Sequence, residues 1–69
     1  MKEIVWLVTN WSKASHRDCL IGVGSSSHGA RQDAGSVPSS ANVSEWDVED
    51  AVRAFPSFEG EIRHFAVAK

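Results

Sequence analysis

Several features that would assign the chain to a familiar class are scarce or missing. Its 69 residues include one cysteine, no tyrosine and two prolines. A single cysteine cannot form an intramolecular disulfide, which excludes the disulfide-stabilised secreted mini-proteins. No apolar run approaches the ~20 residues that a membrane span needs, and the start MKEIVWLV lacks the features of a signal peptide. We therefore expect a soluble, cytoplasmic protein without membrane association.

An excess of basic residues is also missing. The chain has nine acidic and seven basic residues, a formal net charge of −2 at pH 7 and a pI of about 5.8. It therefore lacks the basic surface with which proteins bind phosphate backbones. Hydrophobic residues make up 42% of the chain and charged residues 23%, as in ordinary globular proteins. A chain this short builds one small core, so we expect a single domain over residues 1–69.

Two segments near the N-terminus predict β-strands. Residues 2–11 contain the unbroken apolar run 4–8, which is rich in β-branched and aromatic side chains. Both faces of this strand are apolar, which favours a position in the centre of a sheet. Residues 17–23 predict the second strand. Gly22 and Gly24 indicate a bulge there or a close approach of another backbone.

Residues 44–55 carry the signals of a capped amphipathic helix. Ser44 and Asp47 fit the Ser-x-x-acid pattern of a helix start. Pro56 ends the helix because it restricts the residue before it and lacks a backbone donor. The apolar stripe that would face a core consists of Val48, Ala51, Val52 and Phe55.

Residues 61–68 predict a last strand, which gives the chain the order β-β-α-β. The first strand, apolar on both faces, belongs in the middle of the sheet. We therefore predict an α+β fold with a three-stranded antiparallel sheet of order 2-1-3 and one helix packed on one face. One helix leaves the other face of the sheet bare, so we expect a homodimer; in a monomer, the long loop would have to cover that face.

The segment 24–42 is rich in glycine and serine and has no helical or strand period. A connection this long is usually either functional or disordered, so we expect a mobile loop, and an ordered binding loop is the alternative. Gly24 and Gly29 have the spacing of a phosphate-binding loop, but Ala30 occupies the position of the essential lysine. His28 and Arg31 remain candidates for binding an anion together with backbone amides of the loop.

Signatures of catalysis and metal binding are weak. His16 and Cys19 have a usable ligand spacing, but structural zinc sites usually show paired motifs. No Gly-x-Ser-x-Gly motif marks a nucleophile. We therefore predict no enzyme activity, no metal and no cofactor.

Trp46 is the feature least expected of an ordinary helix. At 100° per residue it lies opposite the apolar stripe, among charged side chains. A large aromatic residue surrounded by acids is typical of a protein-binding hot spot, and an acidic surface favours a partner with a basic surface. The alternatives are that the long loop folds back over Trp46, or that Trp46 lies at the helix start, where the angular position of a side chain is loosely defined. The predicted protein-binding residues are Trp46, Glu45, Glu49, Asp50 and Arg53.

The small size, the acidity, the lack of catalytic signatures and the β-β-α-β order are similar to those of small inhibitors encoded by phages and mobile elements, anti-CRISPR proteins among them. This resemblance is one of class and covers no specific residues. It implies a protein that occludes a partner's surface, such as one that normally meets nucleic acid. A nucleic-acid or anion-binding module that uses Arg17, Arg31 and His28 is the second interpretation. A small enzyme is the third.

Overall fold

A computed structural model describes residues 2–10 and 20–69. The described sheet is antiparallel with the strand order β2-β1-β3, and β4 also pairs with β1. The predicted α+β class is confirmed, with the doubly apolar β1 in the centre. In chain order the elements are β1 (Glu3–Asn10), β2 (Leu20–Gly24), α1 (Ser27–Ala34), β3 (Ala41–Asp47), α2 (Val48–Ala54), the short 3-10 helix η2 (Pro56–Phe58), α3 (Glu59–Phe65) and β4 (Val67–Ala68).

The central strand β1 is paired along both of its edges. On one edge β3 pairs with it without interruption, from Ile4 opposite Asp47 to Asn10 opposite Ala41. On the other edge β4 pairs with the start of β1, and β2 pairs with the stretch from Trp6 onward. Two strands that are far apart in the sequence, β2 and β4, thus share one edge of β1, whereas β3 occupies the other edge alone.

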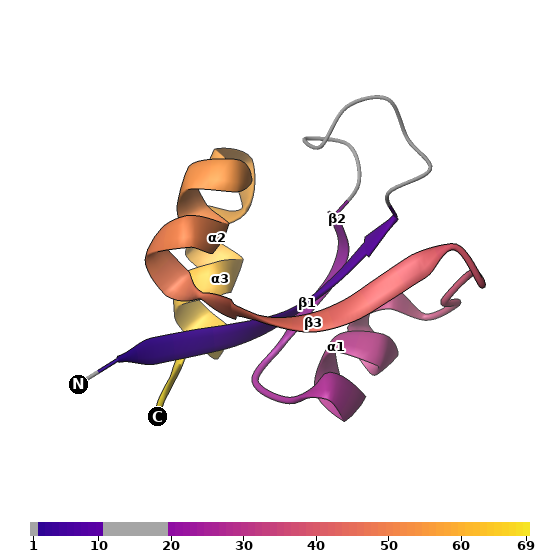
Figure 1. The fold of residues 1–69 in the computed structure, drawn as a ribbon, viewed down its shortest axis with the longest axis horizontal. Coiled ribbons are helices and arrows are strands. Elements are labelled where there is room, and N and C mark those ends of the chain that lie inside the picture. Colours follow the sequence, from indigo (N-terminus) through magenta and orange to yellow (C-terminus); the bar gives the residue numbers. More distant parts are fainter. Residues whose placement is uncertain (1, 11–19) are drawn as a thin grey trace.

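Helices cover both faces of the sheet: α1 lies on one side, and α2 and α3 lie on the other (Figure 1). Successive side chains of β1 point to opposite faces of the sheet, so β1 packs against the helices on both sides. Val5 and Leu7 are fully buried in the core beneath α2 and α3. Trp6 and Val8 lie on the face of α1, because their partners Gly24 and Gly22 contact that helix. The remaining buried members of the main core are Leu20, Val23, Val48, Ala51, Phe55 and Ile62.

Two glycines of β2 let α1 approach the sheet closely. A Cβ atom on Gly24 would lie 2.3 Å from the backbone N of Ala30, and one on Gly22 would lie 2.5 Å from the carbonyl O of the same residue. The predicted close approach of another backbone is therefore confirmed. Asp33 ties the two elements together further, because its Oδ2 accepts a hydrogen bond from the N–H of Val23 over 3.0 Å.

The prediction of a loop over 24–42 is wrong for residues 27–34, which form α1, and for residues 41–42, which begin β3. Ser26 caps this helix by accepting a hydrogen bond from the N–H of Gly29, and Gly35 ends it at a φ of 76°. The helix buries one small residue, Ala30, instead of a stripe, so it has no apolar period to detect. Because α1 covers the face that was predicted to be bare, the original reason for a homodimer is lost.

The prediction that a helix begins at Ser44 is wrong as well. Residues 44–47 belong to β3, and α2 begins at Val48 with Asp47 as its N-cap. The Oδ1 of Asp47 accepts a hydrogen bond from the N–H of Glu49 over 2.9 Å. The end of the helix before Pro56 is confirmed. Three residues of the predicted stripe, Val48, Ala51 and Phe55, are buried, and Val52 is half-buried.

The predicted last strand is mostly helical. Residues 59–65 form α3, with Ile62 buried against the core, and only residues 67–68 pair with β1. The third strand of the predicted 2-1-3 order is therefore β3. No helix in the described part of the chain is long and apolar enough to cross a membrane. The beginning of the second predicted strand, at 17–19, lies outside the described residues.

Candidate functional site: the outer edge of β3 and the charged end

The structure places Trp46 in β3, on the face of the sheet that packs against α2. Its ring meets that of Phe55 in an edge-on contact with centroids 5.8 Å apart, and the side chain is half-buried. Its Nε1 donates a hydrogen bond to the Oγ of Ser44 over 3.0 Å. The prediction that Trp46 lies on the polar face of a helix is therefore wrong, although part of the residue still contacts solvent.

The other predicted binding residues do not share a face with Trp46. Glu45 precedes it in the strand and so lies on the opposite face of the sheet. Glu49, Asp50 and Arg53 lie on the exposed side of α2. The five residues predicted as one surface are thus distributed over a sheet face and a helix.

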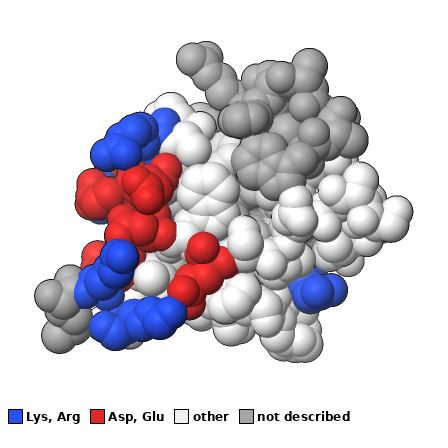
Figure 2. All heavy atoms as spheres, in the orientation of Figure 1, with Lys and Arg blue, Asp and Glu red and all other residues white. Residues whose placement is uncertain are grey.

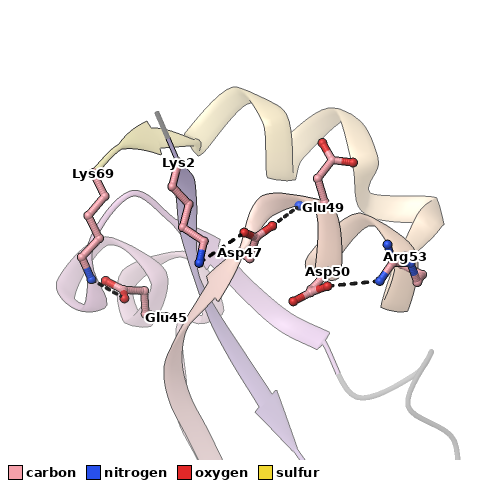
Figure 3. A network of polar contacts seen from close by, with 7 residues as sticks. All are labelled: Lys2, Glu45, Asp47, Glu49, Asp50, Arg53 and Lys69. Carbon is pink, nitrogen blue, oxygen red and sulfur yellow. Dashed lines mark hydrogen bonds and ion pairs between the residues drawn. The ribbon is translucent and has the colours of Figure 1, made fainter.

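Most charged side chains gather at one end of the molecule, which we call the charged end: α2, α3 and both chain termini (Figures 1 and 2). Four acids of the helix start and of β3 each have a basic partner in the same chain, and three of these pairs are drawn in Figure 3. Instead of an unpaired acidic surface, the structure shows a network of both signs. The pairs are Glu45 with Lys69 (2.6 Å), Asp47 with Lys2 (3.9 Å), Asp50 with Arg53 (3.1 Å) and Glu49 with Arg63 (3.7 Å).

Arg63 joins α3 to α2 in this network. Its Nε donates a hydrogen bond to Oε2 of Glu59 over 2.9 Å, and its Nη1 lies 3.7 Å from Glu49. The hydrogen bond to Glu59 is the main cause that raises the pKa of Arg63, with desolvation acting in the opposite direction. Exposed ion pairs of this kind contribute little to stability, so they orient side chains more than they stabilise the fold.

A shallow depression of about 460 Å³ opens at the charged end, between the start of β1 and the start of α2. In the described part of the chain, no three His, Cys, Asp or Glu side chains lie close enough to hold a metal ion. The charged side chains that line the depression are of both signs, so they do not define a binding site for one type of ligand. The depression is lined by Lys2, Glu3, Asp47, Val48 and Glu49.

The candidate anion-binding residues His28 and Arg31 lie on α1, where both are exposed. They are three residues apart on a helix, so they are neighbours on its surface. The flexible loop assumed for them is absent, because the segment around them is helical. Arg17, His16 and Cys19 lie outside the described residues.

A candidate binding feature that the sequence does not predict is the outer edge of β3. The N–H of Lys69 donates to the C=O of Lys2 over 2.8 Å, so Lys2 directs its backbone groups toward β4. Successive residues of an antiparallel strand direct these groups toward opposite edges. Val5, Leu7 and Thr9 therefore direct their N–H and C=O toward β3.

The register fixes which residues of β3 receive these bonds. The residues opposite Val5, Leu7 and Thr9 are the even-numbered ones of β3, so the odd-numbered residues direct their backbone groups outward. Ala41 agrees with this assignment, since its N–H donates to the C=O of Pro38, outside the ladder, over 3.0 Å. No described strand pairs with this edge. The N–H and C=O groups of Val43 and Glu45 therefore form a row without a strand partner in the described structure.

Comparison with known proteins identifies no relative: the chain matches no protein-family model, no curated protein and no solved structure. Any functional assignment therefore depends on the geometry described above.

Proposed function

We propose that this chain is a non-enzymatic protein-binding module whose binding surface is the outer edge of β3, with the exposed part of Trp46 beside it. The observation that carries the proposal is the unbroken seven-residue pairing of β3 with β1, next to an outer edge that no described strand occupies. An exposed edge of this kind binds an extended segment of another protein by adding a strand to the sheet.

The edge lacks the features that usually prevent such pairing. Natural edge strands are protected by proline, lysine, bulges or very short length. Residues 41–47 contain no proline and no lysine, and their register with β1 shows no irregularity. The acids Glu45 and Asp47 are the only charges on the strand, and each has a lysine partner in the same chain. The edge is therefore open to a second strand.

The side chains that border the edge would give such binding its specificity. On the face of α2, an added strand would pass the half-exposed indole of Trp46. On the face of α1 it would pass Val43, which is also half-buried. Successive side chains of the partner strand would thus contact Trp46 on one face of the sheet and Val43 on the other. The module would act by occlusion, because a segment bound here is withheld from its other partners.

The basic character that we expect of a foreign partner depends on the neighbouring charged end. The described residues of α2, α3 and the two termini include more acids than bases. Figure 2 shows this end beside a largely uncharged surface. A partner with basic residues next to its strand would be attracted and steered by the charge difference.

The experiment that tests the proposal is photo-crosslinking in cells with a benzophenone amino acid in place of Asn42, an exposed residue of β3. We expect a specific adduct that disappears when Val43→Pro removes an outward N–H and that persists with Val43→Ala. The same probe in place of Ser57, exposed on η2, is the control position. An identical adduct from residue 57, or one unaffected by Val43→Pro, would refute binding at this edge.

A further inference from the structure

We infer that the strand that occupies the outer edge of β3 is β3 of a second copy of this chain, paired antiparallel about a twofold axis at Ser44. The inference rests on the proposed function, since it names the partner of the same surface. Ser44 is the middle residue of β3, so this axis pairs the strand over its whole length. The two sheets would become one continuous sheet.

The backbone groups fit this arrangement. In the proposed register Val43 faces Glu45 of the second copy, and both residues direct their N–H and C=O outward. Such a pair exchanges both of its backbone hydrogen bonds, and the twofold axis repeats the exchange. At the ends of the strand, the C=O of Ala41 faces Asp47 of the second copy. Its N–H is already bonded to Pro38.

The charges on β3 select this register over its neighbours. An axis at Glu45 would bring two glutamates directly opposite each other, and an axis at Trp46 would set Glu45 opposite Asp47. Parallel pairing in register would set every acid against its own copy. Like charges directly opposite each other destabilise a sheet. About Ser44, each acid faces an uncharged residue, Val43 or Ala41.

The lysine partners reduce the remaining repulsion. Lys69 lies 2.6 Å from Glu45, and Lys2 lies 3.9 Å from Asp47. In each copy, both acids of β3 are therefore paired with a lysine of the same chain. An axis at Val43 would also keep the acids apart, but it would leave the last residues of the strand unpaired. The axis at Ser44 therefore combines the longest pairing with the fewest opposed charges.

A disulfide between two copies of residue 44 tests this register. Residues at the axis form a pair without mutual hydrogen bonds, with Cα atoms ~4.5 Å apart, within the range of a disulfide. In a Cys19→Ser background, we expect Ser44→Cys to form covalent dimers on mild oxidation. Ala41→Cys in the same background is the matched control, because the two copies of residue 41 would lie at opposite ends of the pairing, roughly 20 Å apart.

Sedimentation equilibrium tests the association itself. At high micromolar concentration we expect the native chain to approach twice the 7.5 kDa of one copy. Val43→Pro should shift the dissociation constant at least tenfold toward the monomer, and Val43→Ala should not. Circular dichroism verifies that the proline variant stays folded. If it unfolds, the comparison of the two cysteine variants decides.

The outcomes separate this inference from the proposed function. A native chain that stays at 7.5 kDa overturns self-pairing, and the proposed function then stands or falls with the adduct captured from Asn42. Pairing at this edge is overturned if the dissociation constant of the dimer is unchanged by Val43→Pro and disulfide-linked dimers form no faster through residue 44 than through residue 41. Covalent dimers at residue 44, combined with a mass that falls with Val43→Pro, support both.

Discussion

Trp46 and Phe55 form a T-shaped aromatic pair, with ring centroids 5.8 Å apart and ring planes at 61°. Phe55 is fully buried at the end of α2, whereas Trp46 lies on the edge strand with part of its ring exposed. The pair therefore joins the outer edge of the sheet to the core. Its position gives Trp46 two roles, one in packing and one at the proposed binding surface.

Replacing Trp46 with alanine should cost stability because it removes half of this pair. Truncating a buried tryptophan costs about 3–5 kcal/mol, so we expect about 1.5–3 kcal/mol for this half-buried one. Trp46→Phe should recover most of the loss, since it keeps a ring against Phe55. Urea denaturation measures both. An unchanged midpoint for Trp46→Ala would place the side chain in solvent and contradict the packing described here.

Replacing Gly24 and Gly60 with alanine should have opposite effects on stability. Gly24→Ala should destabilise the fold by about 2–3 kcal/mol, because the added Cβ would lie 2.3 Å from the backbone of Ala30 and α1 would have to move. Gly60→Ala adds a Cβ that meets nothing within 4 Å, and it should stabilise α3 by up to about 1 kcal/mol. Thermal unfolding of the two variants compares them directly. Equal effects would mean that α1 does not rest on β2.

The start of α2 can be located by comparing two candidate caps. Asp47→Ala should cost about 0.5–2 kcal/mol, because it removes the acceptor for the N–H of Glu49. Ser44→Ala removes only the acceptor for the indole N–H of Trp46, for which we expect about 0.5–1 kcal/mol. Denaturant midpoints rank the two. A larger loss for Ser44→Ala would restore the helix start that the sequence pattern suggested.

Thr9 provides a test of the buried sheet face. The residue is fully buried, and its Oγ1 has no hydrogen-bond partner among the described residues. An unsatisfied buried hydroxyl costs about 1–3 kcal/mol, so Thr9→Val should raise the free energy of unfolding by about 1 kcal/mol or more. Thr9→Ala is the control, because it also removes the hydroxyl but leaves a cavity. A destabilised Thr9→Val variant would show that the hydroxyl is satisfied.

Part of the fold could be predicted because the relevant signals are local. The apolar run of β1 has no polar face, and burial on both sides is the only way to remove it from water. The helix before Pro56 could be predicted because an apolar stripe that ends at a proline is typical of an amphipathic helix and fits few other structures. Gly22 and Gly24 by themselves indicate a close approach of another backbone. In each case the side chains of the segment itself indicate the kind of environment in which the segment lies.

The remaining elements were decided by tertiary contacts. Residues 44–47 carry helix-start signals, yet pairing with β1 holds them in a strand and moves the cap to Asp47. Residues 61–68 were predicted as a strand, but Ile62 and Phe65 are three residues apart, and α3 allows both to pack against the core. α1 has almost no apolar period of its own, because two glycines of another element create the surface on which Ala30 packs. The sequence by itself thus determined the centre of the sheet and one helix, whereas the tertiary structure decided the edge strand β3, on which the proposed site depends, because strand pairing satisfies backbone groups that no local pattern records.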